Sequence, residues 1–324
     1  MEQKAKLEGE GIMPQDLEQL KQLIEELRKI EESMRRNIES AMTLDKRISE
    51  TLTRIGISSE GPRNLQKEKT YVPRPPAKPV EGSLEKVSVG VEKVNELLTG
   101  GVRPGMNALL SGPPFSGKYV LAWNFIAASL DEGVPVMVIT TDRDIGEIKY
   151  ELSRIFRNVD EAEETGLLRF IDLYSRTVQQ KPTSKYAAVI DSTSNISSLI
   201  KVTEQIGNDI RANYPYYRVV FTSLNVFVAE LDDKILVKFL QQFTQKRKME
   251  NAVTFFLMEE GQNEKRPSDA ISYIFDGMIE FKTDASRNLL RVHGLGNVRS
   301  RDWIELYLNE TSFDLGSFTL EKIR

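Results

Sequence analysis

The stretch "SGPPFSGKYV" at residues 111–120 decides the fold, because it contains a nearly complete phosphate-binding loop. The pattern G-x-x-x-x-G-K runs from Gly112 to Lys118, after an apolar run and before a helical pattern. A strand, a turn and a helix in this order let backbone N–H groups hold a phosphate. The candidate nucleotide-binding residues are Gly112, Pro113, Pro114, Phe115, Ser116, Gly117, Lys118 and Tyr119.

Two positions of the loop depart from the usual pattern. Phosphate-loop enzymes place Ser or Thr after the lysine as a Mg²⁺ ligand, and this chain has Tyr119, whose hydroxyl lies at the far end of a ring. Phe115 occupies a place where glycine is common, and a positive φ there would strain it. Lys118 opens a helix and so faces the positive end of the helix dipole, a conflict that a bound anion would remove. The loop therefore predicts a phosphate site that accepts ATP or ADP and gives Mg²⁺ no firm ligand.

The rest of residues 84–324 predicts one α/β domain. Short apolar runs alternate with helical patterns, which is typical of a mainly parallel sheet with helices on both faces. The expected strands are 106–112, 134–141, 167–174, 186–192, 217–224 and 252–258. Residues 119–133 and 232–248 have helical patterns, and residues 276–294 resemble a closing hairpin with its turn at 284–288.

The N-terminal part of the chain has a different pattern. Apolar residues repeat at alternating spacings of three and four from Leu17 to Ile55, with Glu31 and Asp45 inside the seam. This heptad pattern predicts an α-helical coiled coil within residues 1–57, and one amphipathic helix on the main domain is the alternative. Residues 58–83 hold five prolines and predict an extended linker. The coiled coil predicts a homo-oligomer.

Composition excludes several classes of function. The chain has no cysteine and one histidine, which rules out disulfides, zinc–thiolate sites and multi-histidine metal sites. A net charge of −4 gives no general attraction to nucleic acid. The N-terminus has no apolar signal region, and no run of about 18 apolar residues could span a membrane. We therefore expect a cytoplasmic protein without a membrane span.

The segment "VGVEKVNELLTGGVRPGMNALLSGPPFSGK" at residues 89–118 resembles the start of a KaiC-type domain of the RecA superfamily. Residues 217–227, 239–261 and 274–282 are similar to the archaeal KaiC-like branch. The resemblance covers residues 84–324. It implies a RecA-like fold that binds ATP and often assembles into rings or filaments, with nucleotide at the subunit interfaces.

The resemblance leaves two candidates for the Walker B carboxylate. Asp191 follows the apolar run at 186–190, and Thr222 follows the run at 217–221. In the family a long helix, a core strand and a hairpin follow the Walker B strand, and this order favours Thr222. Asp191, Ser192 or Ser194 would then cap the next helix. The alternative makes Asp191 the metal carboxylate.

Other family positions depart as well. The paired glutamates that activate water correspond to Asp142, a candidate base on a shorter arm, and Arg143, which inverts the charge. The stretch that contacts the neighbouring subunit's ATP corresponds to Arg291 and His293.

Three hypotheses follow. The first is an inactive or very slow ATPase that serves as an oligomeric scaffold or nucleotide-responsive module for an unknown protein partner. The second is a working ATPase that uses Asp191 and Asp142. The third is a DNA recombination accessory, for which residues 245–248, Arg299 and Arg301 are the local basic candidates, diluted by acidic neighbours.

Overall fold

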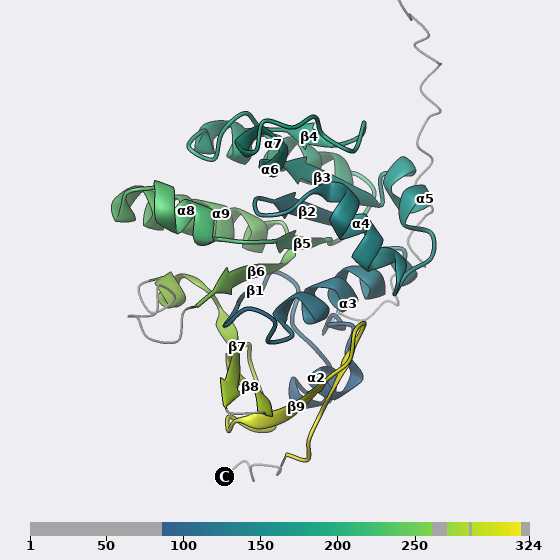
Figure 1. Cartoon of the computed structure of the whole chain (residues 1–324), viewed down its shortest axis with the longest axis vertical. Helices are drawn as coiled ribbons and strands as arrows, with labels where there is room; N and C mark the ends of the chain where they lie inside the picture. Colours follow the sequence, from purple (N-terminus) through teal and green to yellow (C-terminus); the bar gives the residue numbers. More distant parts are fainter. Residues whose placement is uncertain (1–85, 261–270, 285–286, 319–324) are drawn as a thin grey trace, which may run out of the picture. The chain divides into compact units, whose positions relative to one another are not determined.

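The computed structural model describes residues 86–260, 271–284 and 287–318, all within a unit that spans Tyr71–Arg324 (Figure 1). The predicted coiled coil at 1–57 and linker at 58–83 lie outside the described residues.

The described residues form one ten-stranded sheet with the order β10-β9-β8-β7-β1-β6-β5-β2-β3-β4. Strands β7 to β4 in this order are parallel, and β8, β9 and β10 continue the sheet antiparallel. The strands are β1 (Asn107–Gly112), β2 (Val136–Thr140), β3 (Leu168–Asp172), β4 (Ala188–Val189), β5 (Arg218–Phe221), β6 (Val253–Glu259), β7 (Gly277–Asp284), β8 (Arg287–Gly294), β9 (Ile304–Leu308) and β10 (Phe313–Leu315).

Helices cover both faces of the parallel part of the sheet (Figure 1). Successive strand residues alternate between two buried cores: Leu110 packs with α3 and α4 on one face, and Leu109 packs with α7, α8 and α9 on the other. The helices are α2 (Glu92–Leu97), α3 (Lys118–Asp131), α4 (Ile145–Ser153), α5 (Val159–Glu164), α6 (Tyr174–Thr177), α7 (Ile196–Arg211), α8 (Asn225–Glu230), α9 (Asp233–Met249) and the 3₁₀ turn η1 (Ser272–Ile274).

The prediction of an α/β fold with a mainly parallel sheet is confirmed, and each expected strand is present. The hairpin predicted at 276–294 is the β7–β8 pair, in which Asp284 lies opposite Arg287. Strands β9 and β10 were not expected from the sequence, although the apolar side chains of "IELYL" alternate as a half-buried strand requires. These two strands matter because β9 packs on the phosphate loop.

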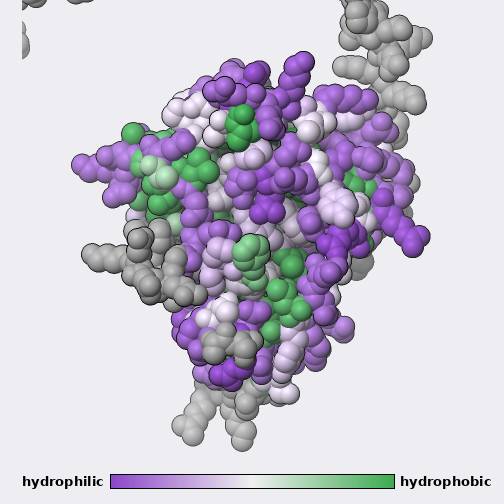
Figure 2. All heavy atoms as spheres, viewed as in Figure 1, coloured by the Kyte–Doolittle hydropathy of each residue, from purple (hydrophilic) through white to green (hydrophobic). Residues whose placement is uncertain are grey.

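The surface in view is largely hydrophilic, with small apolar patches between polar side chains (Figure 2). Within the described residues, none of the helices combines the length and the apolar character that crossing a bilayer requires.

Candidate functional site

The phosphate loop joins the end of β1 to the start of α3, with β7 and β6 on either side of β1. Gly117 is the N-cap of α3 and has φ 102, a conformation that favours glycine. A Cβ at this position would lie 3.2 Å from side-chain atoms of both Leu306 and Leu308 on β9. Phe115 has φ 61 and is 93% exposed, so the position does carry the backbone strain that a positive φ imposes.

Lys118 is the first residue of α3 and is only 1% exposed. Its ammonium donates to the Pro113 carbonyl at 2.9 Å and lies 3.2 Å from Glu259 Oε1 at the end of β6. Burial lowers the pKa of this ammonium, and Glu259 opposes that effect in part. The sequence analysis did not single out Glu259, and its place directly after an apolar run was the available signal. A phosphate at the loop would compete with Glu259 for this cation.

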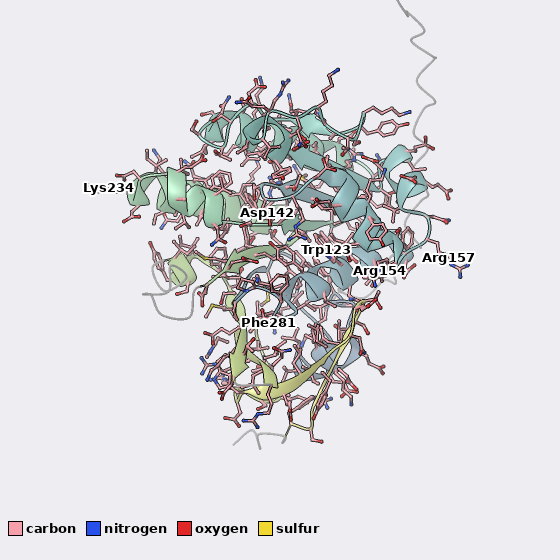
Figure 3. All side chains as sticks on the ribbon, in the orientation of Figure 1. Trp123, Asp142, Arg154, Arg157, Lys234 and Phe281 are labelled. Atoms are coloured by element: carbon pink, nitrogen blue, oxygen red, sulfur yellow. The ribbon has the colours of Figure 1, made fainter. Side chains whose placement is uncertain are left out.

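Three residues that are far apart in the sequence meet beside the loop. The Tyr119 hydroxyl donates to Asp142 Oδ2 at 2.6 Å, and the Thr222 hydroxyl donates to Asp142 Oδ1 at 2.5 Å. Burial, together with the Asp142 carboxylate, raises the pKa of Tyr119, so its hydroxyl keeps its proton and acts as a donor. We call Tyr119, Asp142 and Thr222 the hydroxyl–carboxylate cluster; Figure 3 labels Asp142 near the middle of the domain.

Arg143 covers the outer side of this cluster. Its guanidinium carbon lies 3.9 Å from the centroid of the Tyr119 ring and 5.8 Å from that of Trp123. Arg143 Nε is 3.6 Å from Asp142 Oδ2. A guanidinium over an aromatic face gains a cation–π attraction, which holds this cation next to the phosphate loop.

The residues of this site do not fit Mg²⁺. The ion requires about six oxygen ligands in octahedral geometry, usually with direct carboxylate ligands. The Tyr119 hydroxyl stands at the far end of its ring, Thr222 carries no charge, and the one carboxylate of the cluster, Asp142, accepts both hydroxyls and lies 3.6 Å from Arg143 Nε. Within the described residues, there is no group of three or more His, Cys, Asp or Glu side chains that could hold a metal. The oxygen atoms of Tyr119, Thr222 and Asp142 therefore bond to one another and do not form a binding site for Mg²⁺.

The two Walker B candidates lie at very different distances from the loop. Only β6 separates β5 from β1, so Thr222 is two strand spacings, about 10 Å, from the β1 axis. Asp191 follows β4 at the edge of the sheet, five spacings or about 24 Å away. Its side chain is 84% exposed and pairs with Arg176 at 3.4 Å. The structure brings Thr222 to the loop and leaves Asp191 outside the site.

The expected cap of the helix after Asp191 is wrong. The N-cap of α7 is Asn195, which accepts from Ser198 N, and not Asp191, Ser192 or Ser194. Asn195 is the residue directly before the helix, which is the position where a short polar side chain can reach the free N–H groups of the first turn.

Arg291 and His293 lie on β8 and bond to their own chain. Arg291 Nε and Nη2 donate to Glu280 Oε2 at 2.9 and 2.5 Å, and His293 Nε2 lies 2.6 Å from the same oxygen. Although burial raises the pKa of Glu280, the hydrogen bonds of Arg291 and His293 outweigh it and hold this pKa below its usual value. The guanidinium also covers the Trp303 ring at 4.4 Å.

This geometry belongs to a known class of protein. The family model described as the KaiC ATPase matches residues 87–301, so the chain belongs to the KaiC family of ATPase domains. The resemblance inferred from the loop and its flanking segments is confirmed, and the family generally binds nucleotide.

Individual relatives agree with this assignment. A UPF0273 protein of Methanopyrus kandleri is 32% identical over 130 residues, which are 40% of this chain and 51% of that protein. A UPF0273 protein of Pyrococcus furiosus is 27% identical over 142 residues, 44% of this chain and 55% of that protein. The chain thus spans about half the length of the curated relatives it matches.

A solved structure supports the fold. A KaiC-like protein from Pyrococcus horikoshii superposes with a TM-score of 0.58 at 16% identity, and the match covers 72% of this chain and 99% of that chain. At this identity the likeness concerns the fold alone.

Proposed function

We propose that this chain binds a nucleotide, hydrolyses it very slowly or not at all, and acts as a nucleotide-responsive oligomeric scaffold. The observation that carries the proposal is the hydroxyl–carboxylate cluster, in which Tyr119 and Thr222 both donate to Asp142. Side chains that would hold a metal and activate water in a phosphate-loop enzyme are here bonded to one another.

The proposed loss of turnover follows from the state of Asp142. A general base must hold the attacking water within hydrogen-bond distance, and side-chain hydroxyls that already bond to its oxygens compete with that water. Both Asp142 oxygens accept protein hydroxyls, and Arg143 adds a cation 3.6 Å from one of them. One missing catalytic contact lowers a rate by about two to three powers of ten, so the combined changes should reduce hydrolysis to near background.

Phosphate binding, in contrast, depends on parts that this chain retains. Gly117 keeps the backbone geometry of the loop, and Lys118 is a buried cation at its end. These two features support nucleotide binding by the ordinary phosphate-loop mechanism. The predicted coiled coil at 1–57 supports assembly of several copies, and KaiC-like proteins are often oligomeric.

The test uses the full chain and three measurements: calorimetric ATP binding, phosphate release and sedimentation. We expect ATP binding, turnover at least about 100-fold below the ordinary one per second, and an oligomer. Lys118→Ala should weaken ATP binding by about 100-fold, through loss of a buried phosphate ligand. Lys234→Ala, an exposed lysine on α9, is the matched control and should bind as the unaltered chain does.

Two outcomes would contradict the proposal. Turnover near about one per second, abolished by Asp191→Asn, would establish the working ATPase that uses Asp191 and Asp142. A monomer at every concentration would remove the scaffold role while leaving the nucleotide site intact.

A further inference from the structure

The positive charge that Mg²⁺ usually brings to a bound nucleotide has to come from another group in this site. A nucleoside triphosphate carries several negative charges, and phosphate-loop enzymes neutralise them with a lysine and Mg²⁺. The cluster beside the loop does not fit the ion, and Lys118 is already paired with Glu259 at 3.2 Å. A second cation is therefore needed if the loop is to hold a polyphosphate.

Arg143 is in the right place to be that cation. Its guanidinium lies over the ring of Tyr119, the residue directly after the loop lysine. It is close enough to Lys118 to lower the pKa of that ammonium, which places both cations in one electrostatic neighbourhood. A guanidinium also presents a planar fork of N–H donors that matches phosphate oxygens.

The ion pairs beside the loop also favour Arg143 as the second cation. Two ion pairs lie beside the loop, Lys118 with Glu259 and Arg143 with Asp142. Mg²⁺ in nucleotide sites is usually bound by one or two carboxylates together with waters and the phosphates. Here Asp142 and Glu259 are each paired with a base, and a phosphate that displaces either carboxylate gains that base as its counter-charge.

Two donors in the site make no hydrogen bond within the described residues, although Arg143 Nε lies 3.6 Å from Asp142 Oδ2. The Ser116 hydroxyl lies within the loop, in a residue that is only 1% exposed, and it has no hydrogen-bond partner among the described residues. Arg143 Nε is likewise buried without a hydrogen-bond partner in the described part of the chain. Buried donors are rarely left unsatisfied, so an acceptor from a ligand is the simplest completion of both.

We propose that the loop binds a nucleoside polyphosphate without a divalent cation, and that the guanidinium of Arg143 supplies the positive charge in its place. This inference rests on the proposed function, because it assumes that the loop binds nucleotide. The inference goes further than the proposed function because it assigns Arg143 as the residue that replaces the divalent cation. Arg143 is a binding residue in this scheme, and Tyr119 positions it.

The experiment measures ATP affinity of the full chain by calorimetry, once with EDTA and once with excess Mg²⁺. The unaltered chain should give dissociation constants that agree within about twofold under the two conditions, a difference well below 1 kcal/mol. Arg143→Gln should weaken binding by about 10-fold under both conditions, and Arg143→Lys should restore part of the loss. Arg176→Gln, an exposed arginine at the other edge of the sheet, is the matched control and should change nothing.

The failures are distinguishable. No binding to the unaltered chain under either condition would end the proposed function and this inference with it. Binding that strengthens by more than about 10-fold with Mg²⁺ would overturn the inference alone, as would unchanged affinity in Arg143→Gln. Because the comparison of EDTA with Mg²⁺ needs no variant, the proposal stays testable even if Arg143→Gln fails to fold.

Discussion

The phosphate loop and the strand ends that face it differ in what they offer a bound nucleotide. The loop keeps Gly117 at a positive φ and a buried Lys118, whereas the ends of β2 and β5 carry Asp142, Arg143 and Thr222 bonded or stacked around Tyr119. Phosphate binding uses backbone N–H groups and one lysine, while hydrolysis uses side chains from several separate segments. Phosphate binding and hydrolysis can therefore be lost separately, and this chain has the glycine and the lysine that phosphate binding uses.

The largest expected effect comes from placing metal-binding and acidic side chains in the loop and on the strand ends that face it. The triple variant Tyr119→Thr, Arg143→Glu and Thr222→Asp returns a metal hydroxyl ligand and two carboxylates to the loop. We expect Mg²⁺-dependent ATP turnover at least about 100-fold above that of the unaltered chain, measured by phosphate release.

The triple variant has a second readout that does not depend on turnover. Carboxylates placed beside Asp142 repel one another without an ion, so Mg²⁺ should raise the melting temperature of this variant but not of the unaltered chain. Adding Lys118→Ala is the control and should abolish the gained turnover. A triple variant that shows neither Mg²⁺-dependent stability nor turnover would mean that more than these three positions separates the two regions.

A smaller effect is expected from the loop itself. Gly117→Ala adds a Cβ that meets Leu306 and Leu308 at 3.2 Å in a residue with φ 102, so both clash and backbone strain oppose it. We expect the free energy of unfolding to fall by about 2–3 kcal/mol and ATP binding to be lost.

Gly133→Ala is the matched control for Gly117→Ala. Gly133 has φ 68, and a Cβ there meets nothing within 4 Å, so strain acts alone. Urea unfolding should show a loss of about 1 kcal/mol with ATP affinity unchanged. Equal losses in the two variants would mean that contact with β9 does not shape the loop.

The smallest expected effect concerns Glu280, which lies on β7 opposite Ser111 of β1. Its pKa is held below the usual value in the folded chain, so its contribution is present above the unfolded pKa and is lost as the pH falls through the folded pKa. Glu280→Gln should lower the free energy of unfolding by about 1 kcal/mol at neutral pH. The difference between the two chains should shrink as the pH falls below about 4.5 and vanish below the folded pKa of Glu280, and a constant difference down to strongly acidic pH would contradict this assignment.

Much of the fold was predictable from the sequence, because apolar runs with helical patterns between them leave few architectures. Strands β9 and β10 were not predictable in the same way, because they are short, with 5 and 3 residues. The loop residues were identified by spacing alone, since G-x-x-x-x-G-K is a local pattern. Glu259, in contrast, has only its place after an apolar run as a local signal, and its contact with Lys118 appears only in the folded chain.

The sequence by itself determined the loop and the family, because both are read from residues close together along the chain, and it left Thr222 and Asp191 as alternatives for one position. Only the tertiary structure decided that Thr222 meets Tyr119 and Asp142 in one cluster. Residues 119, 142 and 222 meet because β6, β5 and β2 follow β1 in that order across the sheet. Strand order is set by the packing of the whole domain and cannot be read from any one segment. The two Walker B candidates therefore look alike in sequence, although they lie about 14 Å apart across the sheet.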